Sequence, residues 1–263
     1  MDIIEVLGPA PKGSIIDTHA HYDDERFDEI REELLSKLEE FGVEAVINCA
    51  VDTASAKRIS EIRERFPFCY CAVGFHPENM PDCEPILDDI RALAEQDGVV
   101  AIGEIGLDYY WDKSRMELQK RWFEAQLTLA NELSLPVIVH DREAHGDTLE
   151  ILKKHVPRGV VHCFSGSAET AREIIKLGMY IGVGGVATFK NARVMREVIE
   201  EVPLERILLE TDAPYLAPEP YRGKTCHSGM IIRVAEKISE IKKIPLLDVL
   251  AITKNNAKTL FGI

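Results

Sequence analysis

The segment VVAIGE at residues 99–104 is a short run of apolar residues that ends in a carboxylate. It is rich in Val and Ile and lacks strict alternation of polar and apolar residues, which is typical of a strand buried on both faces of a parallel sheet. Seven further runs share this character: SIIDTH (14–19), EAVINCA (44–50), FCYCAVG (68–74), LPVIVH (135–140), GVVHCF (159–164), MYIGVG (179–184) and RILLETD (206–212). The pattern predicts eight strands.

The segments between these runs have the spacing of helices. Successive runs begin about 20 to 36 residues apart, which leaves room for one helix in each gap. Two gaps carry apolar stripes of helical period rimmed by charged residues: Phe27, Ile30, Leu34, Leu38 and Phe41, and Leu118, Trp122, Ala125, Leu129 and Leu133. A strand followed by a helix eight times predicts an α/β protein with a single (β/α)8 TIM barrel, and an open doubly wound sheet is the alternative.

The chain has 263 residues and no Pro-, Gly- or Ser-rich linker, so we expect one domain over residues 1–263, with residues 1–13 as an N-terminal extension. Lys and Arg number 31 against 45 Asp and Glu, a net charge of −14. This charge excludes a uniformly basic nucleic-acid-binding surface, so any phosphate binding would need a local patch or metal ions.

Sequence signals for export and membrane insertion are weak. The first residues lack the basic region and apolar core of a signal peptide, and no apolar run approaches the about 18 residues that span a bilayer. The six cysteines include no CxxC pair, which argues against a disulfide scaffold or a zinc ribbon. We therefore expect a cytoplasmic protein with reduced, mostly buried thiols, no membrane contact and no stable protein partner.

Most of the predicted strands end in, or next to, a side chain that can bind a metal ion. In a barrel these strand ends converge on one mouth, where active sites are built. The pair His19 and His21 has a spacing of two, so both imidazoles point to one side of an extended chain, as chelation requires. The full set is His19, His21, His76, Glu104, His140, His162, Glu210 and Asp212.

Taken alone, each of these residues has an ordinary structural interpretation. Glu104 could pair with an Arg, since an unpaired buried carboxylate is costly. His140 and His162 could be core histidines, and Asp212 could cap the turn before Pro214. Several independent coincidences would be needed to place all of them on one rim, so the joint pattern favours a metal site.

Two glycine-containing segments are similar to phosphate-binding motifs. RGKTCHSG (222–229) contains GKT, but Pro218 stands where a P-loop needs its first glycine, which excludes a Walker A motif. GVGGVA (182–187) fits GxGxxA, so it indicates a dinucleotide fingerprint, a phosphate-binding turn of a barrel or a plain tight turn. Among the other histidines, we expect His145 to face solvent and His155 to lie at a helix end, while His227 remains undecided.

The chain resembles the TatD family of metal-dependent hydrolases from about residue 14 to the C-terminus. The likeness rests on DTHAHYDDERFD (17–28), GFHPE (74–78), GEIGLDYYWD (103–112), FEAQLTLANELSLPVIVHDREAHGD (123–147), GVVHCFSGS (159–167) and LLETDAPYLAPEPYRGK (208–224). The resemblance implies an amidohydrolase-like barrel with deoxyribonuclease activity, often 3′→5′ on single strands. One departure is Thr225-Cys226-His227-Ser228, where the family usually continues with Arg-Asn and a Pro.

By resemblance, His76 and Glu210 match active-site positions of the family. Six further residues match its metal ligands: His19, His21, Glu104, His140, His162 and Asp212. We expect two divalent cations, with zinc, manganese or iron favoured over magnesium because imidazole joins carboxylate in the ligand set. Glu104 would bridge the two cations. One cation would be held by His19, His21 and Asp212, and the other by His140 and His162.

In this mechanism a water activated by the cations attacks the phosphodiester. Asp212 orients the water or accepts its proton, and His76 donates to a phosphate oxygen, so the expected catalytic residues are Asp212, Glu104, His76 and Glu210. The expected substrate is single-stranded DNA. Candidate phosphate anchors are Lys113, Arg115, Arg142, Lys190, Arg222 and Lys224. The alternatives are a hydrolase of a small amide, ester or phosphoester, and a dinucleotide-binding module that uses GVGGVA.

Overall fold

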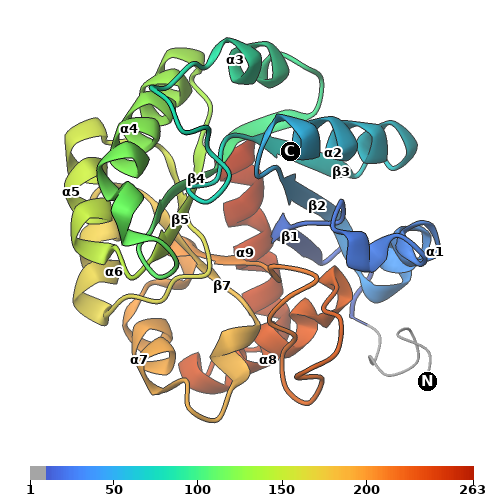
Figure 1. The fold of residues 1–263 in the computed structure, drawn as a ribbon. Coiled ribbons are helices and arrows are strands. Elements are labelled where there is room, and N and C mark those ends of the chain that lie inside the picture. The colour runs from blue at the N-terminus through green and yellow to red at the C-terminus, as the bar shows by residue number, and fades with distance from the viewer. Residues whose placement is uncertain (1–9) are drawn as a thin grey trace.

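A computed structural model describes residues 10–263, in which a central sheet is surrounded by helices (Figure 1). All eight predicted strands are present. They pair in parallel with their neighbours in chain order: β1 (Ile15–Ala20), β2 (Val43–Cys49), β3 (Cys69–Val73), β4 (Val99–Asp108), β5 (Val137–Arg142), β6 (Gly159–Val161), β7 (Tyr180–Val183) and β8 (Ile207–Leu209). Residues 1–9, most of the predicted N-terminal extension, lie outside the described residues.

The sheet curves into a nearly closed barrel, so the barrel prediction is confirmed over the open sheet. Individual contacts rather than a regular ladder join β8 to β1. The hydroxyl of Thr18 donates to the carbonyl of Leu209 at 3.0 Å, and the His21 amide donates to the carbonyl of Ala213 at 2.8 Å. Ala20 forms an isolated parallel bridge with Ala213. This seam brings the chain after β8 beside the His19–His21 segment.

Several strand ends differ from the predicted ones. β4 continues to Asp108 and β5 to Arg142, so Glu104 and His140 lie inside strands rather than at their ends. β6 ends at Val161, so His162 follows the strand instead of lying in it. β8 likewise ends before Glu210. All of these positions still lie at the carboxyl side of the sheet, where a parallel barrel gathers its active-site residues.

Helices follow the strands around the outside of the barrel: α1 (Arg31–Lys37), α2 (Thr53–Arg65), α3 (Asp88–Ala94), α4 (Met116–Leu133), α5 (His145–His155), α6 (Ala168–Lys176), α7 (Arg193–Glu201) and α8 (Ile231–Lys242). The second predicted stripe lies on the continuous helix α4. The first stripe is broken, since 3₁₀ turns at Glu25–Phe27 and Leu38–Phe41 flank α1. Its apolar side chains are nevertheless buried, Leu34 and Leu38 among them, except for Ile30, which is partly buried, because turns of either type keep residues three or four apart on one side.

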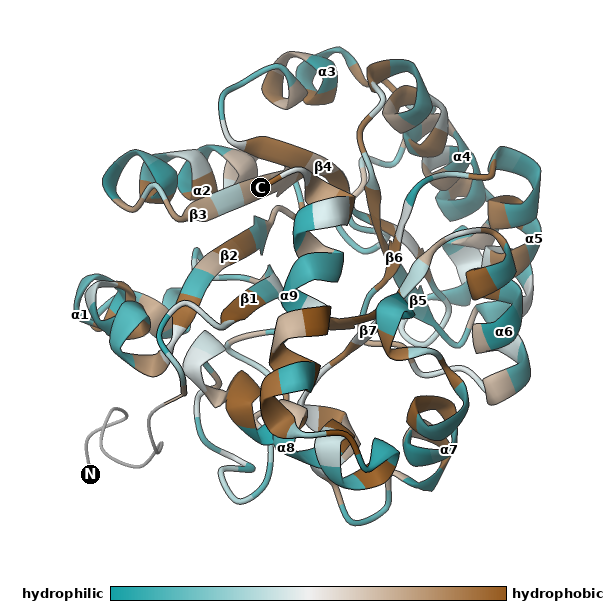
Figure 2. Ribbon diagram, turned by 180° about the vertical axis from the view of Figure 1, so that it is seen from behind, coloured by the Kyte–Doolittle hydropathy of each residue, from teal (hydrophilic) through white to brown (hydrophobic). Residues whose placement is uncertain are grey.

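A further helix, α9 (Leu246–Phe261), crosses the amino-terminal end of the barrel, in front in Figure 2. Leu260 and Phe261 share one buried apolar cluster with side chains from the beginnings of strands, such as Ile16 and Tyr180. Lys254 donates to Glu44 on β2 at 2.6 Å and ties the helix to the barrel. Because α9 covers this end, the polar residues at the opposite end face the open mouth.

The glycine-rich segment 182–187 leads into a 3₁₀ turn, Gly185–Thr188, and the next α-helix begins only at Arg193. A dinucleotide fingerprint needs a helix N-terminus at this point, so that interpretation is wrong. A Cβ at Gly182 would overlap the Oε2 atom of Glu210. The glycine is therefore needed to make room for this carboxyl group.

Two further expectations concern the cysteines and the membrane. All six cysteines are free, and Cys49, Cys69, Cys71 and Cys226 are buried, as predicted. Among residues 10–263, no helix combines the length and the apolar character needed to cross a bilayer.

Candidate metal centre

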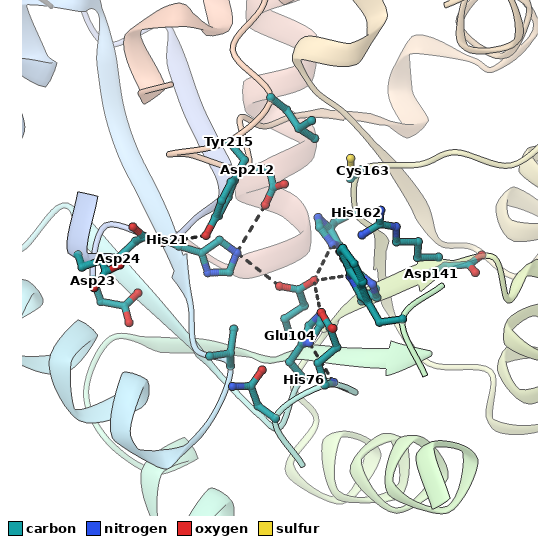
Figure 3. A pocket seen from close by; sticks show the side chains of 18 of the residues that line it. His21, Asp23, Asp24, His76, Glu104, Asp141, His162, Cys163, Asp212 and Tyr215 are labelled. Atoms are coloured by element: carbon teal, nitrogen blue, oxygen red, sulfur yellow. Dashed lines mark hydrogen bonds and ion pairs between the residues drawn. The ribbon is translucent and has the colours of Figure 1, made fainter. Parts of the chain in front are cut away.

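Glu104 lies at the middle of a polar cluster in the barrel mouth (Figure 3). Its Oε2 atom is 3.2 Å from Nε2 of His19 and 3.5 Å from Nε2 of His21. Oδ1 of Asp212 lies 3.7 Å and 3.5 Å from the same two nitrogens. Ligand atoms about 2 Å from a shared ion lie about 3–4 Å from one another, so this half of the cluster has the spacing of a metal site.

The other oxygen of Glu104 faces a second set of imidazoles. Oε1 is 2.7 Å from Nε2 of His162, 2.8 Å from Nδ1 of His140 and 3.6 Å from Nε2 of His76. The His19 and His162 rings stack with centroids 3.8 Å apart, so the two halves adjoin. The two oxygens of one buried carboxylate are thus divided between two groups of donors.

The outward nitrogens of two rings are held in the manner of metal-binding histidines. Nδ1 of His21 is 2.9 Å from the carbonyl oxygen of Cys49, to which it must donate, so Nε2 faces the centre. Nε2 of His140 is 3.0 Å from Oδ2 of Asp108, which leaves Nδ1 facing Glu104. Such outer partners fix ring orientation and raise ligand basicity.

His76 is oriented differently. The backbone N–H of Glu78 donates to Nδ1 of His76 at 3.2 Å, so the neutral ring carries its proton on Nε2. Burial, reinforced by the nearby His140, lowers the pKa of His76 to about 3, so the ring is neutral at pH 7. Its Nε2–H group points toward Glu104, and this residue is therefore a hydrogen-bond donor in the mouth of the barrel.

Protons on two histidines of the cluster compensate the charge of the buried carboxylates. Burial opposes a charge on His21, but its hydrogen bond with Asp212 and the nearby Glu104 outweigh burial and raise the pKa of His21 to about 9. Burial is likewise outweighed at His140, whose hydrogen bonds with Asp108 and Glu104 raise its pKa to about 10. Any cation that binds here must displace these protons.

Glu210 lies behind His162 rather than in the cleft. Its Oε1 accepts a hydrogen bond from the backbone N–H of Cys163 and is 3.9 Å from Nδ1 of His162. Burial raises the pKa of Glu210 to about 8. Oε2 of Glu210 and Nδ1 of His162 are buried without a hydrogen-bond partner.

Contacts between the first and last strands position Asp212. Oδ2 of Asp17 accepts a hydrogen bond from the Thr211 hydroxyl at 2.6 Å, and its Oδ1 accepts one from the Thr211 amide at 3.1 Å. The Asp212 amide donates to the carbonyl of His19 at 3.0 Å. These bonds place the Asp212 carboxylate beside His19 and His21, although about 190 residues separate them in the chain.

The family model described as TatD-related DNase matches residues 16–262. The chain belongs to this family. It is 42% identical over 253 residues to the uncharacterized metal-dependent hydrolase YabD of Bacillus subtilis, covering 95% of this chain and 99% of YabD. A Citrobacter koseri protein named 3'-5' ssDNA/RNA exonuclease TatD is 35% identical over 246 residues, covering 89% of this chain and 93% of that protein.

The crystal structure of YjjV, a TatD homolog from Escherichia coli, superposes with a TM-score of 0.89 at 34% identity, covering 95% of this chain and 99% of YjjV. The resemblance to TatD proteins is thereby confirmed, and this TatD-family member is a metal-dependent hydrolase.

A cleft of about 1120 Å³ opens above the centre of this TatD-family member. Arg142 is the one residue of the six predicted phosphate anchors that lines it. Arg115 instead donates to the carbonyl of Met80 at 2.9 Å, and Arg222 stacks on Phe189. Most charged residues of the lining are acidic: Asp23, Asp24, Glu25, Asp28, Glu78, Glu104, Asp141 and Asp212.

The remaining histidines lie outside the cluster. His145 keeps 37% of its side chain exposed, in line with the expectation that it faces solvent, and it also pairs with Asp141 at 2.8 Å. His155 ends α5 as predicted. His227, undecided from the sequence, is buried with its ring centroid 5.6 Å from that of Phe41.

Sequence reasoning missed Asp108 and the carbonyl of Cys49. Asp108 had a usable signal, since it follows Glu104 by four residues in an apolar run, and a spacing of four keeps both side chains on one face of a strand. The Cys49 carbonyl accepts from His21 because of the register of β1 and β2, and no side chain in the sequence indicates this contact.

Proposed function

We propose that this TatD-family hydrolase is a nuclease that cleaves phosphodiester bonds with two divalent cations bound on either side of Glu104. The observation that carries the proposal is the division of the Glu104 carboxylate, whose Oε2 faces His19 and His21 while Oε1 faces His140 and His162. A carboxylate whose two oxygens face two sets of donors could help to hold two cations, which would supply positive charge for phosphodiester cleavage.

The donor set fits such ions. His19, His21 and Asp212 would hold one cation and His140 and His162 the other, and this mixture of imidazole and carboxylate suits zinc, manganese or iron. Two cations would place positive charge on the phosphodiester and make a water molecule a better nucleophile. They would also supply the positive charge that the acidic cleft otherwise lacks.

The protein groups around the centre take three roles in this proposal. The nearby His21 and His19 hold the pKa of Asp212 below its usual range despite burial, so its carboxylate is ionised at neutral pH and can orient the attacking water or accept its proton. His76 donates its Nε2–H to a phosphate oxygen. Glu210 acts behind His162 as a positioning residue and does not touch the substrate.

Single-stranded DNA cleaved from the 3′ end is the proposed substrate. The support is the Citrobacter koseri relative, which is named a 3'-5' ssDNA/RNA exonuclease, and the presence of Arg142 in the cleft wall. The direction and the strand preference rest on that relative.

A second candidate is a hydrolase of a small phosphoester, ester or amide at the same centre. One observation favours it, because Asp23, Asp24, Glu25 and Asp28 make one wall of the cleft acidic, and an acidic wall repels a long polyanion.

Incubation of an end-labelled single-stranded oligonucleotide with metal-loaded protein separates the two candidates. The nuclease proposal expects a ladder that shortens from the 3′ end with zinc or manganese and no cleavage after chelation. The matched control is His140→Ala, which should leave the oligonucleotide intact. Intact oligonucleotide under all metals, together with metal-dependent turnover of a small phosphoester, would support the second candidate instead.

A further inference from the structure

Two adjacent aromatic residues stand in solvent at the mouth of the cleft. Tyr110 is 54% exposed and Trp111 63% exposed, and they follow β4 after Asp108 and the buried Tyr109. Their rings meet edge to face with centroids 4.7 Å apart. Contiguous exposed apolar surface beside a cleft is typical of a binding surface. Trp111 itself lines the cleft together with His140.

An arginine lies against both rings. The guanidinium carbon of Arg142 is 3.9 Å from the centroid of Tyr110 and 5.2 Å from that of Trp111. Arg142 has no carboxylate partner among residues 10–263, whereas the other arginine of the cleft wall, Arg58, pairs with Asp23 at 3.0 Å. Its charge therefore stays available to an anion in the cleft.

The carboxylate of Asp108 positions both the Tyr110–Trp111 segment and a histidine of the metal centre. Oδ1 of Asp108 accepts hydrogen bonds from the backbone N–H groups of Tyr110 at 2.9 Å and Trp111 at 3.4 Å. Oδ2 of Asp108 faces Nε2 of His140 at 3.0 Å. The aromatic loop is thus held at a fixed position relative to His140, as a substrate subsite must be.

Acidic side chains lie on both sides of the cleft, Asp24 and Glu25 on one and Glu78 and Asp141 on the other. Tyr215 lies on the first side, where its hydroxyl donates to Asp24 at 2.8 Å. Because Arg142 is the cleft arginine without a carboxylate partner among the described residues, a phosphate is attracted to the side where Trp111 stands. A ring that carries a base has a flat apolar face to stack on an exposed indole.

We propose that Trp111, with Arg142 beside it, is a stacking subsite for the nucleobase of the nucleotide whose phosphodiester lies at Glu104. Trp111 takes the base because Arg142 covers the face of Tyr110. The inference deepens the proposed nuclease function and rests on it. Trp111 is then a specificity residue, because it favours phosphodiesters of nucleotides that carry a base over phosphodiesters that lack one.

The test compares two single-stranded DNA oligonucleotides, one with an ordinary 3′-terminal nucleotide and one whose 3′-terminal residue is abasic. Stacking contributes about 1–3 kcal/mol per base, so wild-type kcat/KM should be about 5-fold to 150-fold higher for the ordinary end. Trp111→Ala should remove this preference by slowing the ordinary substrate alone. Tyr215→Ala, which deletes an exposed aromatic ring on the opposite wall, should leave the ratio unchanged.

Two results would overturn the inference. One is equal wild-type rates on the ordinary and the abasic end. The other is a Trp111→Ala variant that slows both substrates by the same factor, because a loop that only supports the metal centre would behave in this way.

A binding measurement keeps the inference separate from the nuclease proposal. Trp111 is the exposed one of the two tryptophans, since Trp122 is buried. Adenosine 5′-monophosphate should quench the tryptophan fluorescence of the zinc-loaded protein, ribose 5-phosphate should not, and Trp111→Phe should lose the response. If no oligonucleotide is cleaved but this quenching occurs, the nuclease proposal fails and the stacking subsite stands. Equal responses to the two phosphates would refute the subsite.

Discussion

The contact between Asp108 and His140 makes a prediction that activity alone would not reveal. Asp108→Asn keeps the side-chain shape and the oxygen that accepts from Tyr110 and Trp111. It replaces the oxygen 3.0 Å from Nε2 of His140 by an NH₂ group. In the neutral His140 ring that would bind a cation, the Nε2–H group and this NH₂ group are two donors that face each other, and the conflict is relieved only if the proton lies on Nδ1, the atom that faces Glu104.

The size of the effect follows from the position of this carboxylate. Asp108 is 1% exposed, so water cannot replace the lost partner. Losing the outer partner of a metal-binding histidine costs about 10- to 100-fold in metal affinity, or about 1.4–2.8 kcal/mol. Competition against a chromophoric zinc chelator at pH 7 measures the affinity of wild type and variant directly.

Asp141→Asn is the matched control, since Asp141 is another cleft carboxylate on β5 that holds a histidine, His145, at 2.8 Å. We expect its zinc affinity to stay within about threefold of wild type, because His145 lies outside the metal centre. Wild-type affinity in Asp108→Asn, or equal weakening in both variants, would refute the reasoning.

Three further predictions concern the centre and the fold. His140→Ala and Asp212→Ala should keep the far-ultraviolet circular dichroism of the wild type and lose activity by at least about a few hundredfold, and near-wild-type turnover in either would remove that residue from the chemistry. Chelation should abolish turnover and added zinc or manganese should restore it; equal rates in chelator and in metal would exclude the proposed mechanism. Burial opposes the charge on Glu44, but hydrogen bonds from Lys254 and Lys258 lower its pKa, so its contribution to stability is present at pH 7 and is lost as the pH falls through the folded-state pKa. Glu44→Gln should therefore reduce the melting temperature at pH 7 by about 2–4 °C or less, with a smaller reduction at pH 3, and a loss that is the same at both pH values would contradict this role.

The sequence predicted the parts of this site that side-chain chemistry marks. Glu104 and His140 stand out because charged or polar residues interrupt apolar strands, and barrel topology then implies that they meet. The sequence could not show that Arg142, rather than Lys113 or Arg222, lines the cleft, because the loop conformation decides which basic side chain reaches it.

Other features depend on backbone geometry. The Cys49 carbonyl is placed by strand register, and the first helix is broken into 3₁₀ and α turns that keep the same apolar residues buried. Helix α9 was not predicted, since its packing across the barrel end is a tertiary arrangement that no local pattern in residues 246–261 specifies.

The division of the Glu104 carboxylate between two sets of imidazoles is the central claim, and anomalous diffraction from crystals soaked in zinc tests it most directly. Two peaks should appear in the barrel mouth, one beside Oε2 near His19 and His21 and one beside Oε1 near His140 and His162. A single peak, or peaks that leave either oxygen of Glu104 without an ion, would contradict the account.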